Sequence, residues 1–452
     1  MHTVVSLFSG CGGLDWGFKE AGFDLIYACD NDQYAVDTYL RNIDHRVYRR
    51  DVTSSEFHTE ISEIGQCDVV LGGFPCQGFS KAGPKTASDP RNTLYLEMLR
   101  TVRTLQPQVF IAENVDGMSQ NFGGEFVQRI LHDFRSVGYD VEHRIIQAAD
   151  YGVPQHRRRI LFVGIRKNRA LKFKWPKTSH VAPLRNGEFK VDYGDCNAAD
   201  ESRGAPRTIA DAIGDLLDTP LGTVQDHLVV QNWSVEDEHI FRAIAPGQKL
   251  CNVRHASSSV YTWDIPEVYG AVTPKQRMVL EAISKNRRHK KYGSVPNGNP
   301  LSLEVIQDLT GLGSANRDIQ SLVKKGYLKV IDGKYDLRGA MFCSGLYKRP
   351  EWNKPAPTVL TVFDSPRYFL HPLRNRPFTV RECARLQSFP DSFVFCPKTT
   401  ATDLKAAYRL IGNAVPPLLG RQLAHAVQNT LASVSSAAIT KDLEHEAANT
   451  YQ

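Results

Sequence analysis

The chain has 452 residues, 42% of them hydrophobic and 23% charged, and at roughly 150 residues per domain this length allows about three domains. The composition excludes collagen-like, low-complexity and largely disordered classes. No apolar run approaches the roughly 20 residues that cross a bilayer, and the net charge of +6 permits a polyanionic partner without requiring one.

Short apolar runs rich in β-branched residues alternate with helical patterns in the first 170 residues. They predict strands at 4–8, 25–29, 68–71, 108–112 and 160–164, and helices at 14–21 and 32–40. This alternation indicates an α/β fold with a doubly wound, mostly parallel sheet. Ligands bind such sheets beyond the carboxyl ends of the strands.

Features of a nucleotide-type site follow the first two predicted strands. The loop from Ser9 to Gly13, with the sequence SGCGG, follows the first strand, and Asp30 follows the second. A carboxylate at that place can accept both hydroxyls of a ribose. A glycine loop alone is weak evidence because glycines serve tight turns in general, and Asp30 strengthens the interpretation.

The next two predicted strands end at a cysteine and a carboxylate. Cys76 lies in the segment FPCQG just after the third strand, and Glu113 follows the fourth. Their ordinary interpretations are a small buried thiol and a solvated strand end. If these strands are neighbours, however, Cys76 and Glu113 converge on one cleft as a nucleophile and a proton donor.

A dense basic cluster, QHRRR, precedes the strand at 160–164. In an extended segment, alternation places Gln155, Arg157 and Arg159 on one side. A solvated basic edge strand is the ordinary interpretation of such a cluster.

Taken together, these motifs resemble those of the cytosine carbon-5 DNA methyltransferases of bacterial restriction-modification systems. The motifs FSGCGG, Asp30, GGFPCQGFS, ENV and QHRRR occur in the family's order. The last two family motifs match RPFTVRECARLQSFPD from Arg376 and IGNAVPP from Ile411, so that the resemblance brackets residues 1–168 and 346–430.

The resemblance implies how the chain is divided. Residues 1–170 and 400–452 are expected to form a Rossmann-like catalytic domain that binds S-adenosylmethionine. Residues 171–399, where the strand-helix alternation is lost, are expected to form a smaller, irregular target-recognition domain.

The resemblance also implies a covalent mechanism. Cys76 would bond to carbon 6 of cytosine to activate carbon 5, and Glu113 would donate or share a proton at nitrogen 3. Arg157 and Arg159 would hold Glu113 and the base in register, and the base would be flipped out of the duplex. The matched motifs add three neighbours to this catalytic set, namely Pro75, Val115 and Gln155.

The cofactor residues are likewise carried over from the family. Asp30 is assigned to the ribose, and Asp51 with Val52 to the vicinity of the adenine. Asn31 departs from the family, in which many members carry an aromatic residue, so stacking on the adenine is weaker or comes from elsewhere. The other expected cofactor residues are Phe8, Gly10, Cys11, Gly12, Gly13, Leu94, Asn413 and Val415.

Residues 273–337 have a pattern of their own within the middle segment. Three helical stretches precede a hairpin with a strong Asp-Gly turn, which predicts a winged helix-turn-helix insertion. A small helical packing module is the alternative. The third helix, starting near Ser314, would read base edges, and the preceding loop would contact phosphates. With the loop after the nucleophile, the expected DNA contacts are Ser80, Lys81, Arg287, Arg288, Asn316 and Arg317.

The preferred interpretation is a DNA (cytosine-5) methyltransferase that acts on double-stranded DNA. We expect a monomer that is linked in function, without a stable complex, to a restriction endonuclease. The catalytic motifs alone leave open a transfer-RNA cytosine-5 methyltransferase, and a catalytically silent DNA-binding repressor is a further alternative. A Rossmann dehydrogenase is the weakest option because it leaves Cys76 and the basic cluster without a role.

Cysteine usage and the amino-terminal sequence bear on location. The nine cysteines are scattered and form no Cys-x-x-Cys pair, which disfavours a disulfide framework and a zinc site. The opening MHTVVSLFSG lacks the features of a signal peptide. We therefore expect free thiols, no metal, and a location in the bacterial cytoplasm in association with the nucleoid.

Overall fold

The computed structural model describes residues 1–75, 93–119, 124–167, 172–181, 203–253, 257–295, 298–338 and 345–449. The chain forms two compact units. Unit 1 comprises Met1–Leu228, Lys354–Thr361 and Val380–Gln452, and unit 2 comprises Val229–Asn353 and Val362–Thr379. These limits differ from those of the expected domains, because three segments of the expected recognition domain, 171–228, 354–361 and 380–399, belong to unit 1.

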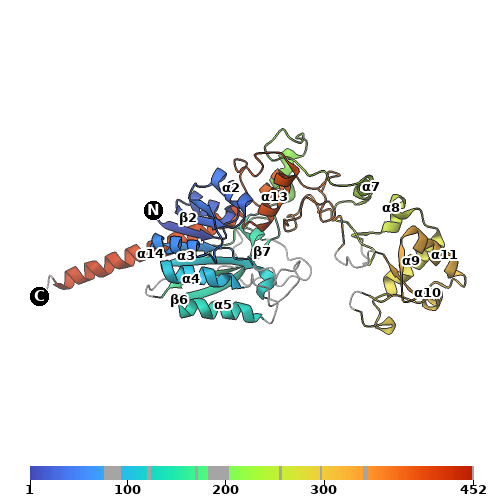
Figure 1. The fold of residues 1–452 in the computed structure, drawn as a ribbon, viewed down its shortest axis with the longest axis horizontal. Coiled ribbons are helices and arrows are strands. Elements are labelled where there is room, and N and C mark those ends of the chain that lie inside the picture. The colour runs from blue at the N-terminus through green and yellow to red at the C-terminus, as the bar shows by residue number, and fades with distance from the viewer. Residues whose placement is uncertain are drawn as a thin grey trace. The chain divides into compact units, whose positions relative to one another are not determined.

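A seven-stranded sheet in the order β3-β2-β1-β4-β5-β7-β6 is the centre of unit 1 (Figure 1). Its first five strands are parallel, and β7 runs antiparallel to both β5 and β6. The expected doubly wound, mostly parallel sheet is thus confirmed. The strands are β1 Thr3–Leu7, β2 Asp24–Asp30, β3 Val47–Arg49, β4 Val69–Gly72, β5 Val109–Val115, β6 Tyr139–Gln147 and β7 Arg158–Arg166.

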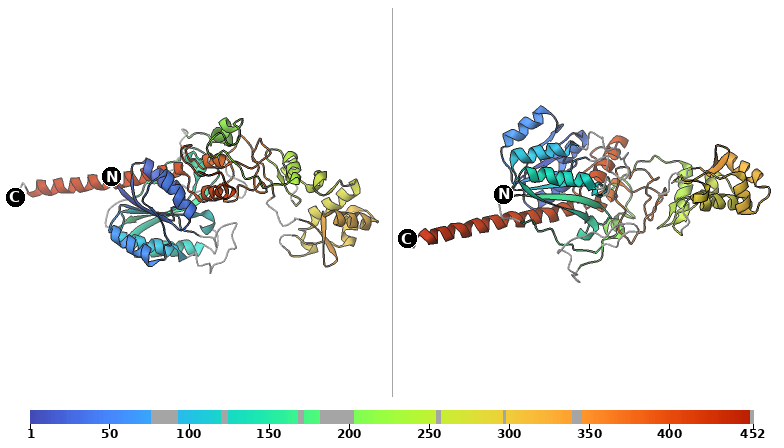
Figure 2. Two further views of the ribbon diagram at one scale, coloured as in Figure 1. Left: turned by 45° about the horizontal axis from the view of Figure 1, so that its top comes forward. Right: turned by 90° about the horizontal axis from the view of Figure 1, so that it is seen from below.

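Helices cover both faces of this sheet (Figures 1 and 2). Three of them, α3, α4 and α5, bury apolar side chains against one face in a single hydrophobic cluster. Helix α1 packs along α14. The helices of unit 1 are α1 Gly13–Glu20, α2 Gln33–Asn42, α3 Ser55–Ile64, α4 Tyr95–Leu105, α5 Glu125–Ser136, α6 Ile209–Ile213, α12 Val380–Leu386, α13 Ala401–Asn413 and α14 Pro417–Asn449.

The two outer strands, β3 and β6, are those that the sequence pattern did not predict. β3 has only three residues, two of which are exposed. β6 alternates between buried and exposed positions along its first four residues. An edge strand faces water on one side and so lacks the continuous apolar run that marks a buried strand.

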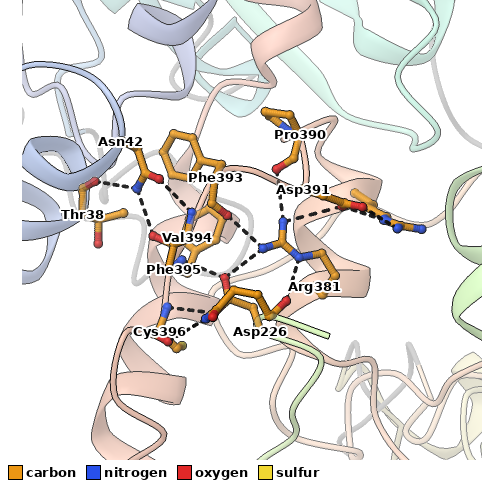
Figure 3. A network of polar contacts seen from close by, with 12 residues as sticks. Thr38, Asn42, Asp226, Arg381, Pro390, Asp391, Phe393, Val394, Phe395 and Cys396 are labelled. Atoms are coloured by element: carbon orange, nitrogen blue, oxygen red, sulfur yellow. Dashed lines mark hydrogen bonds and ion pairs between the residues drawn. The ribbon is translucent and has the colours of Figure 1, made fainter. Parts of the chain in front are cut away.

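A buried ion pair joins the segment before unit 2 to the segment after it (Figure 3). The Arg381 guanidinium lies 3.1 Å from Asp226 Oδ2, and both side chains are fully buried. Arg381 also donates to the carbonyl oxygens of Pro390 and Phe393. Its Nε donates to the Gln225 carbonyl oxygen at 3.0 Å. Each nitrogen of the guanidinium therefore meets an acceptor, which offsets the cost of burying the charge.

Unit 2 is built from short elements around two hydrophobic clusters. The elements are α7 Val235–Ala243, β8 Lys249–Leu250, β9 Ser259–Val260, α8 Pro266–Tyr269, α9 Pro274–Asn286, α10 Leu303–Thr310, α11 Ala315–Lys325, β10 Leu328–Ile331 and β11 Lys334–Leu337. Three helices and an antiparallel hairpin thus occupy 274–337, in the order that the sequence pattern predicted.

Two further findings bear on the expectations about thiols and membranes. The six cysteines in the described part of the chain, Cys11, Cys29, Cys67, Cys251, Cys383 and Cys396, are all buried. None of the helices in the described part of the chain combines the length and the apolar character that a membrane span needs. The buried thiols pack as small apolar groups, in keeping with their usual role.

Candidate active site

A cavity of about 580 Å³ opens at the carboxyl ends of β1, β2, β4 and β5 in unit 1. Strand ends form one side of its wall, and residues of α13 and the turn that follows it form another. The expected catalytic and cofactor residues that line it are Phe8, Gly10, Cys11, Gly13, Asp30, Asn31, Asp51, Val52, Pro75, Leu94, Glu113, Val115, Arg159, Asn413 and Val415. Segments some 400 residues apart in sequence therefore share one pocket.

The loop between β1 and α1 has a backbone that glycine makes possible. Gly10 and Gly12 adopt φ values of +55° and +87°, which side chains rarely tolerate. A Cβ at Gly12 would lie 2.0 Å from a carbon of Ile43, and one at Gly13 would lie 2.3 Å from the Val415 carbonyl oxygen. Gly12 does not line the cavity, but its turn allows the adjacent Cys11 and Gly13 to line it.

Asp30 closes the same loop from the end of β2. Its carboxylate oxygens accept the backbone N–H groups of Gly10 and Asp32, each at 2.9 Å. Burial raises the pKa of Asp30, and these two hydrogen bonds oppose that rise. Asp51 lies on the same wall, where hydrogen bonds from Thr53 lower its pKa. Both carboxylates keep lone pairs that remain available to a ligand.

Glu113 and Arg159 form an ion pair across two antiparallel strands. Val115 of β5 is opposite Arg159 of β7, so Glu113 is the diagonal neighbour of Arg159 on the same face. Arg159 Nε lies 2.7 Å from Glu113 Oε1, and both side chains are about nine-tenths buried. The sequence placed both residues at one site, and the pairing fixes the direction in which the carboxylate points.

The chain that leads to the expected nucleophile is fixed by Asn114. Its side-chain amide donates to the Phe74 carbonyl oxygen at 2.9 Å, and Pro75 lines the cavity. Cys76 follows directly and lies outside the described residues, as do Ser80 and Lys81. Asn114 was not among the predicted site residues, although its place within the ENV motif was a signal for it.

Gln155 and Arg157 have a different role from the one expected. Neither lines the cavity. The Gln155 amide donates to the Leu386 carbonyl at 2.8 Å and to Gln387 Oε1 at 2.6 Å, and its oxygen accepts from the Val359 N–H. Gln155 therefore binds carboxyl-terminal segments to the sheet.

Arg157 is fully buried and bridges the same segments. Its guanidinium donates to the carbonyl oxygens of Gly412 at 3.0 Å and Val359 at 3.4 Å. Burial and the nearby Arg159 lower the pKa of Arg157, and Glu113 partly offsets this effect. The alternation along an extended segment predicted that Arg157 and Arg159 share one side. The hydrogen bonds of Arg157 go to main-chain carbonyl oxygens and not to Glu113.

A buried carboxylate that the sequence did not single out lies on the wall near the glycine loop. Asp15, in the first turn of α1, is 1% exposed and lines the cavity. Ser6 Oγ donates to its Oδ1 at 2.8 Å, whereas Oδ2 has no hydrogen-bond partner. Burial raises the pKa of Asp15 to about 7, against the hydrogen bond from Ser6.

Among the expected DNA contacts in unit 2, Arg287 requires a correction. It is 3% exposed, and its guanidinium makes two bonds to Asp336, at 2.8 and 2.9 Å. A cation committed to a buried, bidentate pair is not available to a phosphate. Arg288, Asn316 and Arg317 are exposed.

Comparison with known proteins gives a family match over nearly the whole chain. The family model described as C-5 cytosine-specific DNA methylase matches residues 2–429. That range includes both the strand ends that line the cavity and the segment from α13 to α14 that closes it.

Similar proteins include two type II methyltransferases. M.DdeI from Desulfomicrobium norvegicum is 31% identical over 432 residues, which cover 94% of this chain and 88% of that protein. M.HgiCI from Herpetosiphon aurantiacus is 28% identical over 433 residues, covering 92% and 95%. A crystal structure described as a DNA modification methyltransferase encoded within a prophage of E. coli has a TM-score of 0.52 and 25% identity, and covers 95% of this chain and 99% of that one.

The role of Arg157 as a bridge can be tested by Arg157→Met. We expect a loss of about 3 kcal/mol in unfolding free energy, because two buried carbonyl oxygens lose a charged donor. Weaker binding of S-adenosylmethionine should accompany it, since Gly412 lines the cavity. Arg166→Met, at the solvated end of the same strand, is the control and should change stability by less than about 0.5 kcal/mol. Equal urea midpoints for the two variants would contradict the bridging role.

The raised pKa of Asp15 predicts a pH-dependent effect on stability. The folded chain holds a proton there up to about pH 7, whereas the unfolded chain releases it near pH 4. Stability associated with this carboxyl is therefore lost as the pH rises from 4 through 7. Asp15→Asn should raise the melting temperature of the ligand-free protein, more at pH 8 than at pH 5. Calorimetry that gave the larger gain at pH 5 would disprove the assignment.

Proposed function

Because the chain belongs to the C-5 cytosine-specific DNA methylase family, we propose that it uses this cavity to methylate carbon 5 of a cytosine that is flipped out of duplex DNA. As a DNA cytosine-5-methyltransferase, it needs an activated base, because carbon 5 is a poor nucleophile. The observation that carries the proposal is the buried Glu113–Arg159 pair on the cavity wall. Asn114, the residue after Glu113, binds the Phe74 carbonyl oxygen in the chain that leads to Cys76.

Cys76 would supply the activation. Its thiolate adds to carbon 6 and pushes electron density toward carbon 5, while Glu113 donates or shares a proton at nitrogen 3. Arg159 holds the Glu113 carboxyl in place. After methyl transfer, loss of the carbon-5 proton returns the electron pair to the ring, and the thiolate leaves carbon 6.

The lining of the cavity fits S-adenosylmethionine, which supplies an electrophilic methyl group when bound. Asp30 would bind the ribose hydroxyls and Asp51 with Val52 would lie near the adenine. The positive φ angles of the glycine loop bring backbone close to the ligand. Asn413 and Val415 would complete the pocket from the carboxyl-terminal side.

We also propose that residues 273–337 form a winged helix-turn-helix that contacts DNA. Helices α10 and α11 are joined by a short turn, and Leu301 and Tyr335 exchange two backbone hydrogen bonds of 2.9 and 2.8 Å, which form an isolated antiparallel bridge to the hairpin. The segment contains 12 Lys and Arg against 6 Asp and Glu. It therefore carries +6, which equals the net charge of the whole chain and suits a surface that binds phosphates.

One face of α11 is suited to the major groove. Ala315, Ile319 and Leu322 are buried, and the polar residues are on the opposite side. At 100° per residue, the exposed stripe spans about 100° and consists of Asn316, Arg317, Gln320 and Lys324. Arg288 in the loop after α9 and the lysines beside it would contact phosphates, and Ser80 and Lys81 would contact DNA near the target base.

The two type II relatives support a place in a restriction-modification system. In such a system the modification protects DNA from a cognate endonuclease, and no stable complex with that endonuclease is required. We also propose that the protein is a monomer that works in the bacterial cytoplasm at the nucleoid. A transfer-RNA substrate is the alternative for the same catalytic groups.

The proposal is tested by methyl transfer from labelled S-adenosylmethionine to mixed-sequence duplex DNA and, in parallel, to transfer RNA. Base-resolution mapping of the product should find 5-methylcytosine in one recurring DNA sequence. Label in the RNA alone would replace the substrate and overturn the DNA assignment. Tight DNA binding without any label would favour the silent repressor.

The covalent step predicts the behaviour of Cys76→Ala. Turnover should fall below detection, because carbon 5 loses its activation, whereas specific DNA binding should be largely retained. Cys67→Ala, at a buried thiol outside the cavity wall, is the matched control and should remain active. Substantial residual turnover in Cys76→Ala would exclude the covalent mechanism.

The exposed stripe on α11 predicts the behaviour of Arg317→Glu. Reversing this charge should weaken DNA binding by at least about tenfold at low salt and reduce the salt dependence of binding. Turnover at saturating DNA should change little, because the reacting groups belong to unit 1. Glu304→Lys, on the preceding helix, is an exposed charge reversal for comparison. Unchanged affinity and unchanged site preference in Arg317→Glu would rule out the DNA-contacting role.

A further inference from the structure

The Asp15 carboxylate is buried in the cavity wall without a partner that compensates its charge. Ser6 Oγ is the donor to Oδ1, at 2.8 Å, and Oδ2 has no hydrogen-bond partner. The Tyr39 phenol is the other polar group beside Asp15, and hydrogen bonding from it lowers the pKa of the carboxyl; the hydroxyl and Oδ2 nevertheless have no hydrogen bond of normal geometry. A buried charge without a counter-ion is costly, and proteins rarely keep one without a ligand or a reason.

The other carboxylates on the wall are compensated within the protein. Asp30 accepts two backbone N–H groups, and Asp51 accepts both donors of Thr53. Glu113 pairs with Arg159, and Asp32 pairs with Arg409. Among the described residues of the wall, Asp15 alone has neither a basic partner nor a backbone N–H donor.

The basic side chains on the wall offer no free cation for Asp15. Arg159 and Arg409 are engaged as above, and Arg50 pairs with Glu56 and Glu60. Among the described residues of the wall, one carboxyl beside the glycine loop therefore has neither a cation nor an N–H donor. Without a ligand a proton neutralises it up to about pH 7, and a cationic ligand would stabilise its ionised form.

We propose that Asp15 is the counter-ion for the positively charged sulfonium of the methyl donor and that it selects the donor over its uncharged thioether product. This inference rests on the proposed function. The donor and the product differ at one sulfur: when the methyl group leaves for carbon 5, the electron pair of the broken bond stays on sulfur, which becomes neutral. An anion in a water-poor wall responds strongly to that single change of charge.

The negative charge of Asp15 affects donor binding and product release. An anion near the sulfonium stabilises the bound donor more than a transition state in which the positive charge is leaving the sulfur. Asp15 therefore favours donor binding and product departure and does not accelerate the transfer step. It acts as a specificity-determining residue and not as a catalytic one.

Calorimetric titration of the full chain tests the proposal with three ligands: S-adenosylmethionine, S-adenosylhomocysteine, and an analogue in which a protonated amine replaces the sulfonium. Asp15→Asn keeps the shape and removes the charge. We expect it to weaken both cationic ligands by at least about tenfold, a loss of about 1.4 kcal/mol or more, and to leave the affinity for S-adenosylhomocysteine within about threefold. The single-turnover rate of methyl transfer at saturating donor should not fall.

Three further variants separate the effect of the Asp15 charge from the effect of the local structure. Ser6→Ala removes the hydroxyl that binds Asp15 and retains the carboxylate, so the preference for cationic ligands should persist. Asp51→Asn removes another carboxylate from the same wall and should weaken all three ligands to a similar extent. Asp15→Ser supplies a second neutral variant, and melting curves show whether each protein is folded.

The possible results are distinct. Equal weakening of all three ligands by Asp15→Asn would mean that Asp15 binds a part common to donor and product, and an unchanged affinity for all three would mean that it binds none of them. Either result overturns the inference and leaves the proposed function standing. Failure of the unaltered chain to bind any of the three would instead contradict the proposed function.

Discussion

The buried hydrogen bonds of Gln155 and Arg157 hold together the part of the molecule on which the site depends. They join the sheet to three later segments through Val359, Leu386 and Gly412. Unit 1 is discontinuous, so Val359 returns to the sheet after the first segment of unit 2, and Leu386 and Gly412 return after the second. A fully buried guanidinium is costly, and main-chain carbonyl oxygens at fixed positions are what offset that cost here.

The cavity combines rigidity with an uneven distribution of charge. Its carboxylates are held by backbone N–H groups, hydroxyls or arginines, and the Glu113–Arg159 pair is locked across two strands. Asp15 is the exception, because its neighbours supply no cation. Because Asp15 has neither a cation nor an N–H donor beside it, its ionised form depends more on the charge of a ligand than the other carboxylates of the wall do.

The most basic segment of the chain and the proposed reacting groups belong to different units. The segment 273–337 carries a net charge of +6, equal to that of the entire chain, while the proposed reacting groups belong to unit 1. The pairing of Arg287 with Asp336 shows that composition alone overstates the basic surface, because one arginine of the cluster serves the interior. The residues left exposed on α11 and in the loop after α9 define the surface that the proposal assigns to DNA.

The sequence by itself determined the class of the sheet and the positions of its buried strands along the chain. It also determined the loop and strand-end residues of the cavity, and the helices with the hairpin at 274–337. These features follow from local patterns: apolar runs, positive-φ glycines and turn residues act within a few positions of the chain. Only the tertiary structure decided that β3 and β6 complete the sheet, that Arg157 bonds to carbonyls instead of Glu113, that Arg287 is buried, and that Asp15 lacks a counter-ion. Each of these depends on partners far away in sequence, and burial, which sets the cost of a charge, is a property of the packed chain and not of any segment.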